Sequence, residues 1–253
     1  MGIKERRTKI LLALVLLSDV NLSSVDLGPT AQMIFDITFN QKTRGSISGL
    51  VREELIEKVD GQEEAASDLT NRYKLTDKGF FALCLEFPYF RFLKDKWDEK
   101  WRVLSYEIPE KKRELRDKLR REVSGWGLGP WHRSFWLTPH PIIENLRQLV
   151  SQKEEEKYIQ AFESEHVFGD REILIEKVWQ KSILDKHYRD LFKTWHDILA
   201  GEAEKKEKFK KVIEKFVDVL KNDPGLPKEL VGSNWIGFEA FNIFKEIRSI
   251  LLS

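Results

Sequence analysis

Residues 101–138 read WRVLSYEIPEKKRELRDKLRREVSGWGLGPWHRSFWLT and give the clearest indication of the fold. From here onward we predict a strand over residues 101–108, a helix over 109–123 and a strand over 131–138. A helix over 141–152 and a strand over 158–168 follow. Strands that alternate with helices at this pace favour a small α+β sandwich of ferredoxin-like type. We expect this central domain to span residues 98–169.

Three predicted helices precede the central domain, over residues 9–18, 30–39 and 46–59. A polar, turn-like segment follows over 60–71, then a short strand over 72–75 and a helix that begins with Thr76 as its N-cap. This is the order of elements in a winged helix-turn-helix, in which the third helix enters the DNA major groove. We therefore expect a winged-helix DNA-binding domain over residues 1–83.

The remaining parts of the chain are a connecting segment and a helical end. Residues 84–97 combine Pro88 with five aromatic residues, which indicates a segment whose rings pack on neighbouring domains rather than a free linker. From Asp170 onward apolar residues recur at helical spacing, so residues 170–253 are predicted to form a helical C-terminal domain. The expected fold class is thus α+β.

Composition places limits on the possible functions. The chain has 253 residues and a net charge of +1 from 43 basic and 42 acidic side chains, which excludes binding of polyanions by bulk charge but not by a local basic patch. The single cysteine, Cys84, excludes an internal disulfide and a multi-cysteine zinc site within one chain. A reducing cytoplasm fits this cysteine usage best.

An apolar run near the start resembles a signal peptide only superficially. Four basic residues precede the run from Ile10 to Leu17, which is too short to span a bilayer and has no cleavage pattern after it. We expect a buried first helix here, and no membrane association.

Polar and basic side chains cluster at the start of the third predicted helix. Between Gln41 and Arg52 there is no acidic residue. The candidate DNA-contacting residues are Lys42, Thr43, Arg44, Ser46, Ser48 and Arg52. Basic side chains and free N–H groups of a helix start bind phosphates, while short polar side chains reach base edges. The alternative interpretation is a solvated helix start without a partner.

Two motifs resemble a known family. Trp101 to Glu110, together with the continuation through Arg113 and Arg116 to Pro139, resembles the central domain of PaaX-type regulators. Residues 191–199 resemble the aromatic helix of that family, and the segment Asp223-Pro-Gly-Leu-Pro-Lys-Glu-Leu230 with Trp235 resembles its terminal motif. Together with the winged-helix order of elements upstream, the likeness covers nearly the whole chain in the right order.

The resemblance implies a regulator of transcription rather than an enzyme. PaaX-type proteins repress phenylacetic acid degradation in bacteria, so the chain is expected to be a cytoplasmic, dimeric repressor that binds a double-stranded operator. An acyl-CoA thioester such as phenylacetyl-CoA is expected as the effector that releases the DNA. No cofactor is expected.

An acyl-CoA has a polyanionic end and an apolar end, so its site needs arginines near an aromatic cleft. The candidate effector-binding residues are Arg113, Arg116, Arg120, Trp179, Tyr188, Phe192 and Trp195. We expect them to meet between the central and the C-terminal domain. The alternative is that the arginines form a solvated helix face and the rings belong to the core.

Two other functions stay open. The central domain also resembles the small ferredoxin-like nuclease subunit of CRISPR adaptation, in which a carboxylate at the end of the first strand holds a metal. Glu107 occupies that place, but one carboxylate provides few ligands for a hard divalent cation. The histidines have no compact ligand spacing, so no metal site is predicted from them. A third possibility is an interaction module without operator binding, because Glu63, Glu64 and Asp68 would repel phosphate.

Overall fold

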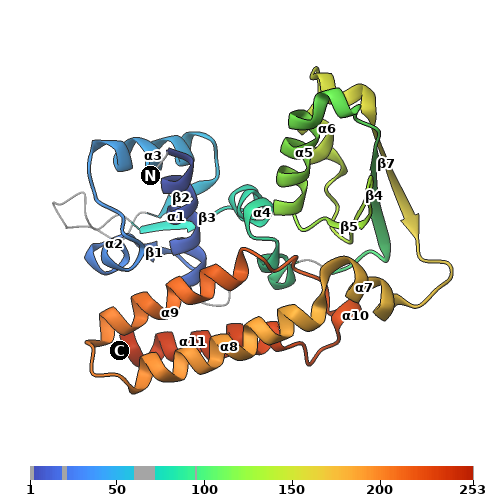
Figure 1. Cartoon of the computed structure of the whole chain (residues 1–253). Coiled ribbons are helices and arrows are strands. Elements are labelled where there is room, and N and C mark those ends of the chain that lie inside the picture. The colour runs from blue at the N-terminus through green and yellow to red at the C-terminus, as the bar shows by residue number, and fades with distance from the viewer. Residues whose placement is uncertain (1–2, 19–21, 60–71, 95, 253) are drawn as a thin grey trace. The chain divides into compact units, whose positions relative to one another are not determined.

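The structure, a computed structural model, describes residues 3–18, 22–59, 72–94 and 96–252 (Figure 1). The chain divides into two compact units. One unit comprises Met1–Leu83, Leu191–Asp218 and Ala240–Ser253, and the other comprises Cys84–Asp190 and Val219–Glu239. Both contain helices and strands, which confirms the α+β class. The expected division at residues 83, 97 and 169 stays a prediction.

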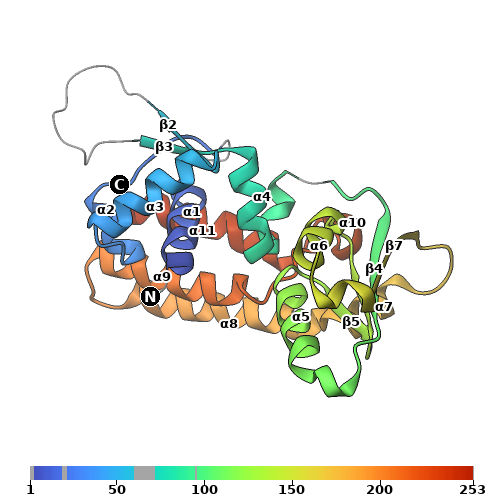
Figure 2. The same ribbon diagram turned by 90° about the horizontal axis from the view of Figure 1, so that it is seen from above.

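The first unit begins with helices and a small sheet. The helices are α1 (Ile3–Leu16), α2 (Pro29–Phe35), α3 (Gln41–Arg52) and α4 (Asp77–Glu86), the last of which continues beyond the unit. The strands are β1 (Val25–Asp26), β2 (Ile56–Val59) and β3 (Arg72–Leu75), in the order β1-β3-β2 with antiparallel pairing. Helix α1 contacts both α2 and α3, as Figures 1 and 2 show.

Helix α1 is buried as expected from its apolar run. Ile10, Leu14 and Leu16 are at most 1 % exposed, so the run from residue 10 onward forms part of a core. The unit also contains parts of the long helices α8 (Lys181–Ala200), α9 (Lys205–Leu220) and α11 (Ile236–Leu252). None of the helices in the described part of the chain is both long enough and apolar enough to cross a membrane.

The third helix differs from the sequence-based expectation at both ends. It begins at Gln41 because Asn40 caps it, and it ends at Arg52 because Glu54 takes a positive φ of 60°. The segment Ile56–Val59, predicted as part of this helix, is a strand that pairs with β3. The second helix is also shorter than expected, since Asp36 turns left-handed after Phe35. The predicted turn at 60–71 lies outside the described residues.

The second unit contains a four-stranded antiparallel sheet. Its strands are β4 (Lys100–Tyr106), β5 (Gly129–His132), β6 (Phe135–Thr138) and β7 (Ile159–Glu165), in the order β5-β6-β4-β7. Helices α5 (Arg113–Gly125) and α6 (Ile143–Val150) lie on one face of the sheet, and the chain order βαββαβ is that of a ferredoxin-like domain (Figure 1). Leu104, Trp136 and Leu146 belong to the core between these layers.

One predicted strand of this domain is a hairpin. Residues 131–138 were expected to be continuous, but the chain turns at Arg133-Ser134, and β5 pairs with β6 with a register shift between Pro130 and His132. The extra strand completes the four-stranded sheet. The unit also holds the short 3-10 helices η2 (Pro88–Leu93), η3 (Glu110–Lys112) and η4 (Glu154–Tyr158), and the helices α7 (Arg171–Trp179) and α10 (Lys228–Val231).

Candidate DNA interface, effector residues and pockets

The start of α3 is fixed by two side chains. The Asn40 side chain accepts a hydrogen bond of 3.1 Å from the backbone N–H of Thr43. Thr43 in turn donates its hydroxyl proton to the carbonyl of Thr38 at 2.6 Å, and its side chain is fully buried. The sequence therefore sets the helix start at a defined place.

The exposed face of α3 carries the basic residues. Lys42, Arg44, Ser48 and Arg52 are exposed, and three of them recur at intervals of four residues along one side of the helix. Gly45 shares this face, and a Cβ at its position would meet no atom within 4 Å. The helix thus presents a basic surface on which the backbone at Gly45 is not covered by other side chains.

Two of the predicted DNA contacts face inward. Thr43 is engaged with Thr38, and Ser46 donates its hydroxyl proton to the carbonyl of Lys42 at 2.9 Å while only 7 % exposed. The expectation that their hydroxyls are presented to bases is wrong, because α3 turns both positions toward the core. Four of the six predicted DNA-contacting residues are exposed: Lys42, Arg44, Ser48 and Arg52.

Acidic residues just beyond α3 have basic partners. Glu53 pairs with Arg7 of α1, and this bond lowers the pKa of Glu53. Glu54 lies 3.4 Å from the ammonium of Lys78. Both pairs are exposed, so their contribution to stability is small, but they offset the negative charge next to Arg52.

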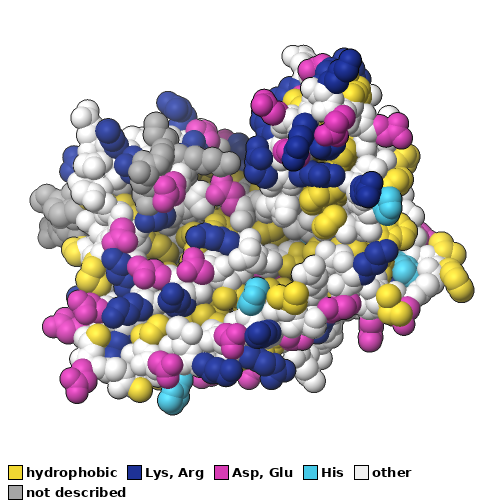
Figure 3. Space-filling view, viewed as in Figure 1, with side chains coloured by type: hydrophobic (Ala, Val, Ile, Leu, Met, Phe, Trp, Pro, Cys, Tyr) yellow, Lys and Arg dark blue, Asp and Glu magenta, His cyan; other side chains and the backbone are white. Residues whose placement is uncertain are grey.

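The three arginines proposed for the effector have partners within their own domain. Arg116 donates to Glu110 at 2.6 Å, and Arg113 lies 3.5 Å from Asp117. Arg120 donates to the Tyr106 hydroxyl at 2.6 Å. Figure 3 shows basic and acidic side chains interspersed over α5, as in a solvated, ion-paired helix face.

The four aromatic residues proposed for the effector mostly act as structural side chains. Trp179 stacks on Trp101 and donates to the carbonyl of Gly127 at 3.0 Å. Trp195 is 1 % exposed and donates to the carbonyl of Val212, with Phe192 beside it. Phe192 and Trp195 belong to the first compact unit, whereas the arginines, Trp179 and Tyr188 belong to the second. These contacts favour the core interpretation for the rings.

Tyr188 supports a buried loop rather than a cleft. Its hydroxyl donates a hydrogen bond of 2.5 Å to the carboxylate of Asp223, and both residues are at most 2 % exposed. The second carboxylate oxygen accepts from the N–H of Gly225 at 2.7 Å. Burial raises the pKa of Asp223 to about 6. The segment Asp223-Pro-Gly-Leu-Pro227 is therefore a rigid turn anchored from inside.

Comparison with protein families matches both motifs that carry the resemblance. Residues 94–173 match the family described as PaaX protein central Cas2-like domain, and residues 179–253 match the PaaX-like protein C-terminal domain. The two matches together cover more than half of the chain. The chain belongs to the PaaX family.

Structural comparison agrees with this at the level of the fold. The chain resembles the solved structure titled Uncharacterized protein Rv0674 from Mycobacterium tuberculosis, with a TM-score of 0.52 and 16 % identity over 90 % of this chain and 87 % of that one. At this identity the likeness concerns the fold alone. No curated protein sequence matches this member of the PaaX family.

Glu107, the candidate metal ligand of the Cas2-like domain, directly follows β4. Its backbone N–H donates to the carbonyl of Tyr158 at 2.9 Å, and its side chain is exposed. Within the described ranges, no three His, Cys, Asp or Glu side chains converge as they would around a metal ion. A site built on Glu107 alone has little to offer a hard cation.

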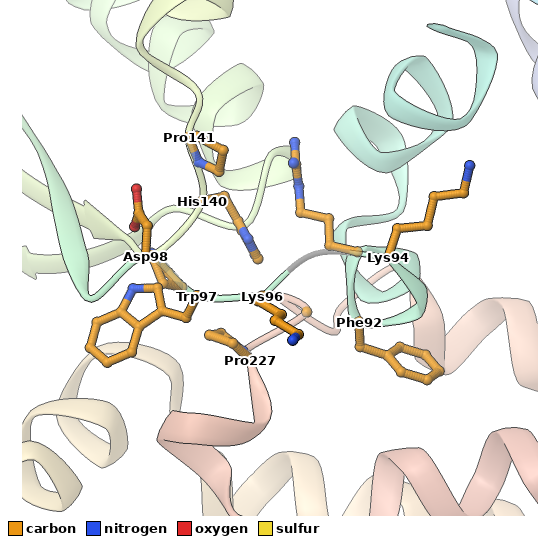
Figure 4. A pocket seen from close by; sticks show the side chains of 11 residues that line it. Phe92, Lys94, Lys96, Trp97, Asp98, His140, Pro141 and Pro227 are labelled. Carbon is orange, nitrogen blue, oxygen red and sulfur yellow. The ribbon is translucent and has the colours of Figure 1, made fainter. Parts of the chain in front are cut away.

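Two pockets in the second unit were not predicted from the sequence. One, of about 250 Å³, is lined by Arg91, Lys96, His140 and their neighbours (Figure 4). The other is an apolar groove of about 560 Å³ next to β7 and α7, lined in part by Trp131, Phe168 and Ile173. The lining residues lie far apart in the sequence, so spacing gave no signal of either pocket. The run of basic and aromatic residues at 91–97 was the one local hint.

Proposed function

We propose that this PaaX family member is a DNA-binding regulator of transcription, and that it acts as a repressor. The single observation that carries this proposal is the exposed face of α3, with Lys42, Arg44, Ser48 and Arg52 and no acidic residue along the helix. Such a face suits the major groove, where phosphates meet cations and base edges meet polar groups.

The elements around α3 support a winged helix-turn-helix. Helices α1, α2 and α3 precede an antiparallel pair, β2 and β3, that fits the place of a wing. In that arrangement α3 is the recognition helix and residues 1–83 form the DNA-binding domain. A chromosomal operator would place the protein in the cytoplasm.

The proposed repressor is a homodimer, since paired half-sites require paired recognition helices. The apolar groove beside the edge strand β7 supports self-association, because Val167 and Phe168 next to it are more than 90 % exposed. A second copy of the chain is the proposed occupant. Sedimentation of Phe168→Ser against wild type tests this, and a monomeric wild type would contradict it.

The effector part of the proposal is a CoA thioester that weakens DNA binding. Arg113, Arg116 and Arg120 of α5 would hold its phosphates. Tyr188 and Trp195 are at most 1 % exposed, so the rings expected to face the acyl group are left out of this proposal. The present hydrogen-bond and ion-pair partners of these arginines would have to give way to the phosphates of the ligand. Calorimetry with phenylacetyl-CoA tests this part separately from DNA binding.

The experiment for the DNA part is a binding titration with duplexes from upstream of the gene that encodes the chain. We expect saturable binding by wild type and by Lys118→Gln, whose side chain is exposed on α5. We expect loss of most affinity in Lys42→Gln, Arg44→Gln. Equal binding by all three proteins would remove α3 from the interface.

A further inference from the structure

The four-stranded sheet of the second unit has two edge strands of different character. One edge strand, β5, spans four residues, contains Pro130 and shifts register between Pro130 and His132. The other, β7, spans seven residues and pairs with β4 along its whole length, with no proline in it (Figure 1). Prolines and bulges hinder the pairing of an edge strand with another chain. The sheet therefore blocks the β5 edge and leaves the β7 edge able to pair.

The hydrogen-bond pattern shows which backbone groups of β7 point outward. The Glu107 N–H donates to the Tyr158 carbonyl at 2.9 Å, which continues the β4–β7 ladder by one hydrogen-bonded pair. Since hydrogen-bonded and non-hydrogen-bonded pairs alternate along an antiparallel ladder, Phe162 points its backbone groups toward β4, whereas Ala161 and Glu163 point theirs outward. In the described part of the chain, no strand pairs with this outer side of β7.

The side chains of β7 are open to solvent on both faces of the sheet. Residues 160–165 are all exposed, and the side chain of Phe162 is 53 % exposed. Phe162 lies on the face opposite α5 and α6, because it pairs with Val103, whose neighbour Leu104 belongs to the core under these helices. An exposed aromatic ring in the middle of an open edge strand is typical of an interaction surface.

The strand β7 is complementary to itself when two copies run antiparallel with Phe162 at the two-fold axis. The outward groups of Ala161 then meet those of the second copy's Glu163 as a hydrogen-bonded pair, and the two Phe162 rings form an aromatic cross-strand pair. Each Glu165 lies opposite an Ile159, so no two carboxylates stand directly opposite each other. A register centred on Glu163 would bring two carboxylates together, which is unfavourable.

The same register covers apolar residues that follow β7. Val167 and Phe168 are more than 90 % exposed and line the apolar groove of about 560 Å³. Continued past Glu165, the pairing brings the end of the second copy's η4 beside residues 166–168. Burial of these apolar side chains adds to the backbone hydrogen bonds of the paired strands.

We propose that two copies of the chain join through their β7 strands, antiparallel and centred on Phe162, so that their sheets become one continuous sheet. The occupant of this edge is a second copy, because β7 avoids opposed carboxylates when it pairs with itself and because the pairing covers Val167 and Phe168. This inference rests on the homodimer proposed above, for which it names the strand, its direction and its register.

The first test is disulfide cross-linking of the full chain, in which the single native cysteine, Cys84, is buried. Residues of a non-hydrogen-bonded antiparallel pair have Cα atoms about 4.5 Å apart, within the range of a disulfide. We therefore expect Phe162→Cys to form covalent dimers on oxidation. Phe135→Cys is the matched control and should stay monomeric on a denaturing gel, because Phe135 is exposed on the same face but belongs to the inner strand β6.

A mixing experiment tests the register. Gln160 lies opposite Ser164 of the second copy in the proposed pairing, and both are exposed. Gln160→Cys and Ser164→Cys should each stay unlinked when oxidised alone, because equivalent positions lie too far apart for a disulfide. The two variants should form covalent dimers when they are mixed, allowed to exchange under reducing conditions and then oxidised. Cross-linking of either variant alone would contradict the register.

A backbone variant tests the strand pairing itself. Ala161→Pro removes an outward N–H and leaves the hydrogen bonds to β4 in place. We expect its dimer dissociation constant in sedimentation to rise about tenfold or more relative to wild type, as for the loss of backbone hydrogen bonds. Ala161→Ser retains the N–H and should dimerise as wild type does.

The outcomes separate this interface from the homodimer in general. A dimeric wild type in which Phe162→Cys does not cross-link would overturn pairing through β7 and leave the homodimer standing. Cross-linking of Phe135→Cys would also overturn it, since the open faces of the two sheets would then pack together. A wild type that sediments as a monomer would overturn both proposals. Thermal unfolding of each variant checks that the fold is intact.

Discussion

The imidazole of His140 lies 2.8 Å from the carbonyl oxygen of Pro224, 84 residues further along the chain. This contact joins the segment that matches the Cas2-like domain to the segment that matches the PaaX C-terminal domain. The ring is buried, and burial lowers the pKa of His140 to about 3, so a neutral imidazole donates its Nε2 proton to this carbonyl.

The first prediction concerns pH. The pKa of His140 falls from 6.5 to about 3 on folding, so below pH 6.5 the unfolded chain binds a proton that the folded chain does not. The contribution of His140 to stability is therefore full above pH 6.5 and declines by about 1.4 kcal/mol per pH unit as the pH falls toward 3.

His140→Gln separates this contribution from all others. The difference in unfolding free energy between wild type and this variant should shrink between pH 6.5 and 4.5 in urea titrations. Asp223, whose pKa is raised to about 6, acts in the opposite direction in this range, but it is present in both proteins and largely cancels. A difference that stays constant with pH would contradict a buried neutral His140.

The second prediction concerns the Tyr188 and Asp223 pair. Tyr188→Phe removes a buried hydrogen bond to the carboxylate, which should cost about 2 kcal/mol at pH 8, where Asp223 is ionised. The cost should be smaller at pH 5, since a protonated Asp223 needs the hydroxyl less. Tyr158→Phe, at the half-buried end of η4, is the control: its hydroxyl accepts a hydrogen bond from Lys112 and contacts no buried carboxyl group, so its cost should not change between pH 8 and pH 5 in this way.

The third prediction concerns glycine positions. Gly225→Ala places a methyl group 2.1 Å from the Pro88 carbonyl at a positive φ, so we expect a loss of about 3 kcal/mol in unfolding free energy. Gly125→Ala, where nothing lies within 4 Å, should be neutral or slightly stabilising. Similar thermal midpoints for the two variants would show that the loop is not as tightly packed as described.

Most strands and helices of the central domain were predicted from the sequence, but the pairing of β5 with β6 in a hairpin was not. Apolar strands and amphipathic helices are recognised from local sequence patterns, and most of those predicted for this domain are present in the structure. The hairpin at Arg133-Ser134 was missed because no Gly, Pro or Asn marks the turn. Helix α3 was predicted to start too late, although Asn40 is a regular N-cap residue.

The candidate sites were harder to predict, because tertiary contacts decide which side chains are available. Thr43 and Ser46 are polar in sequence but buried in the structure. The pocket of about 250 Å³ joins Arg91 to His140, which no spacing rule connects. The positive charge of Arg120 suggested a phosphate contact, but its guanidinium donates hydrogen bonds to the Tyr106 hydroxyl and to the carbonyl of Arg133.

The fourth prediction separates a regulator from a nuclease. Glu107 stands without two further metal-ligating side chains among the described residues, so we expect no cleavage of DNA or RNA with Mg²⁺ or Mn²⁺. Gel assays should compare wild type with Glu107→Gln. Cleavage by wild type that disappears in the variant would make the Cas2-like domain catalytic.

The measurement that tests the central claim most directly is the salt dependence of duplex binding. Each lost phosphate contact should reduce the slope of log K against log salt by about 0.9. We predict a slope lower by about 1 to 2 for Lys42→Ala, Arg44→Ala than for wild type, with an unchanged slope for Lys118→Ala. Identical affinities and slopes for wild type and the double variant would contradict the assignment of α3 as the DNA-contacting helix.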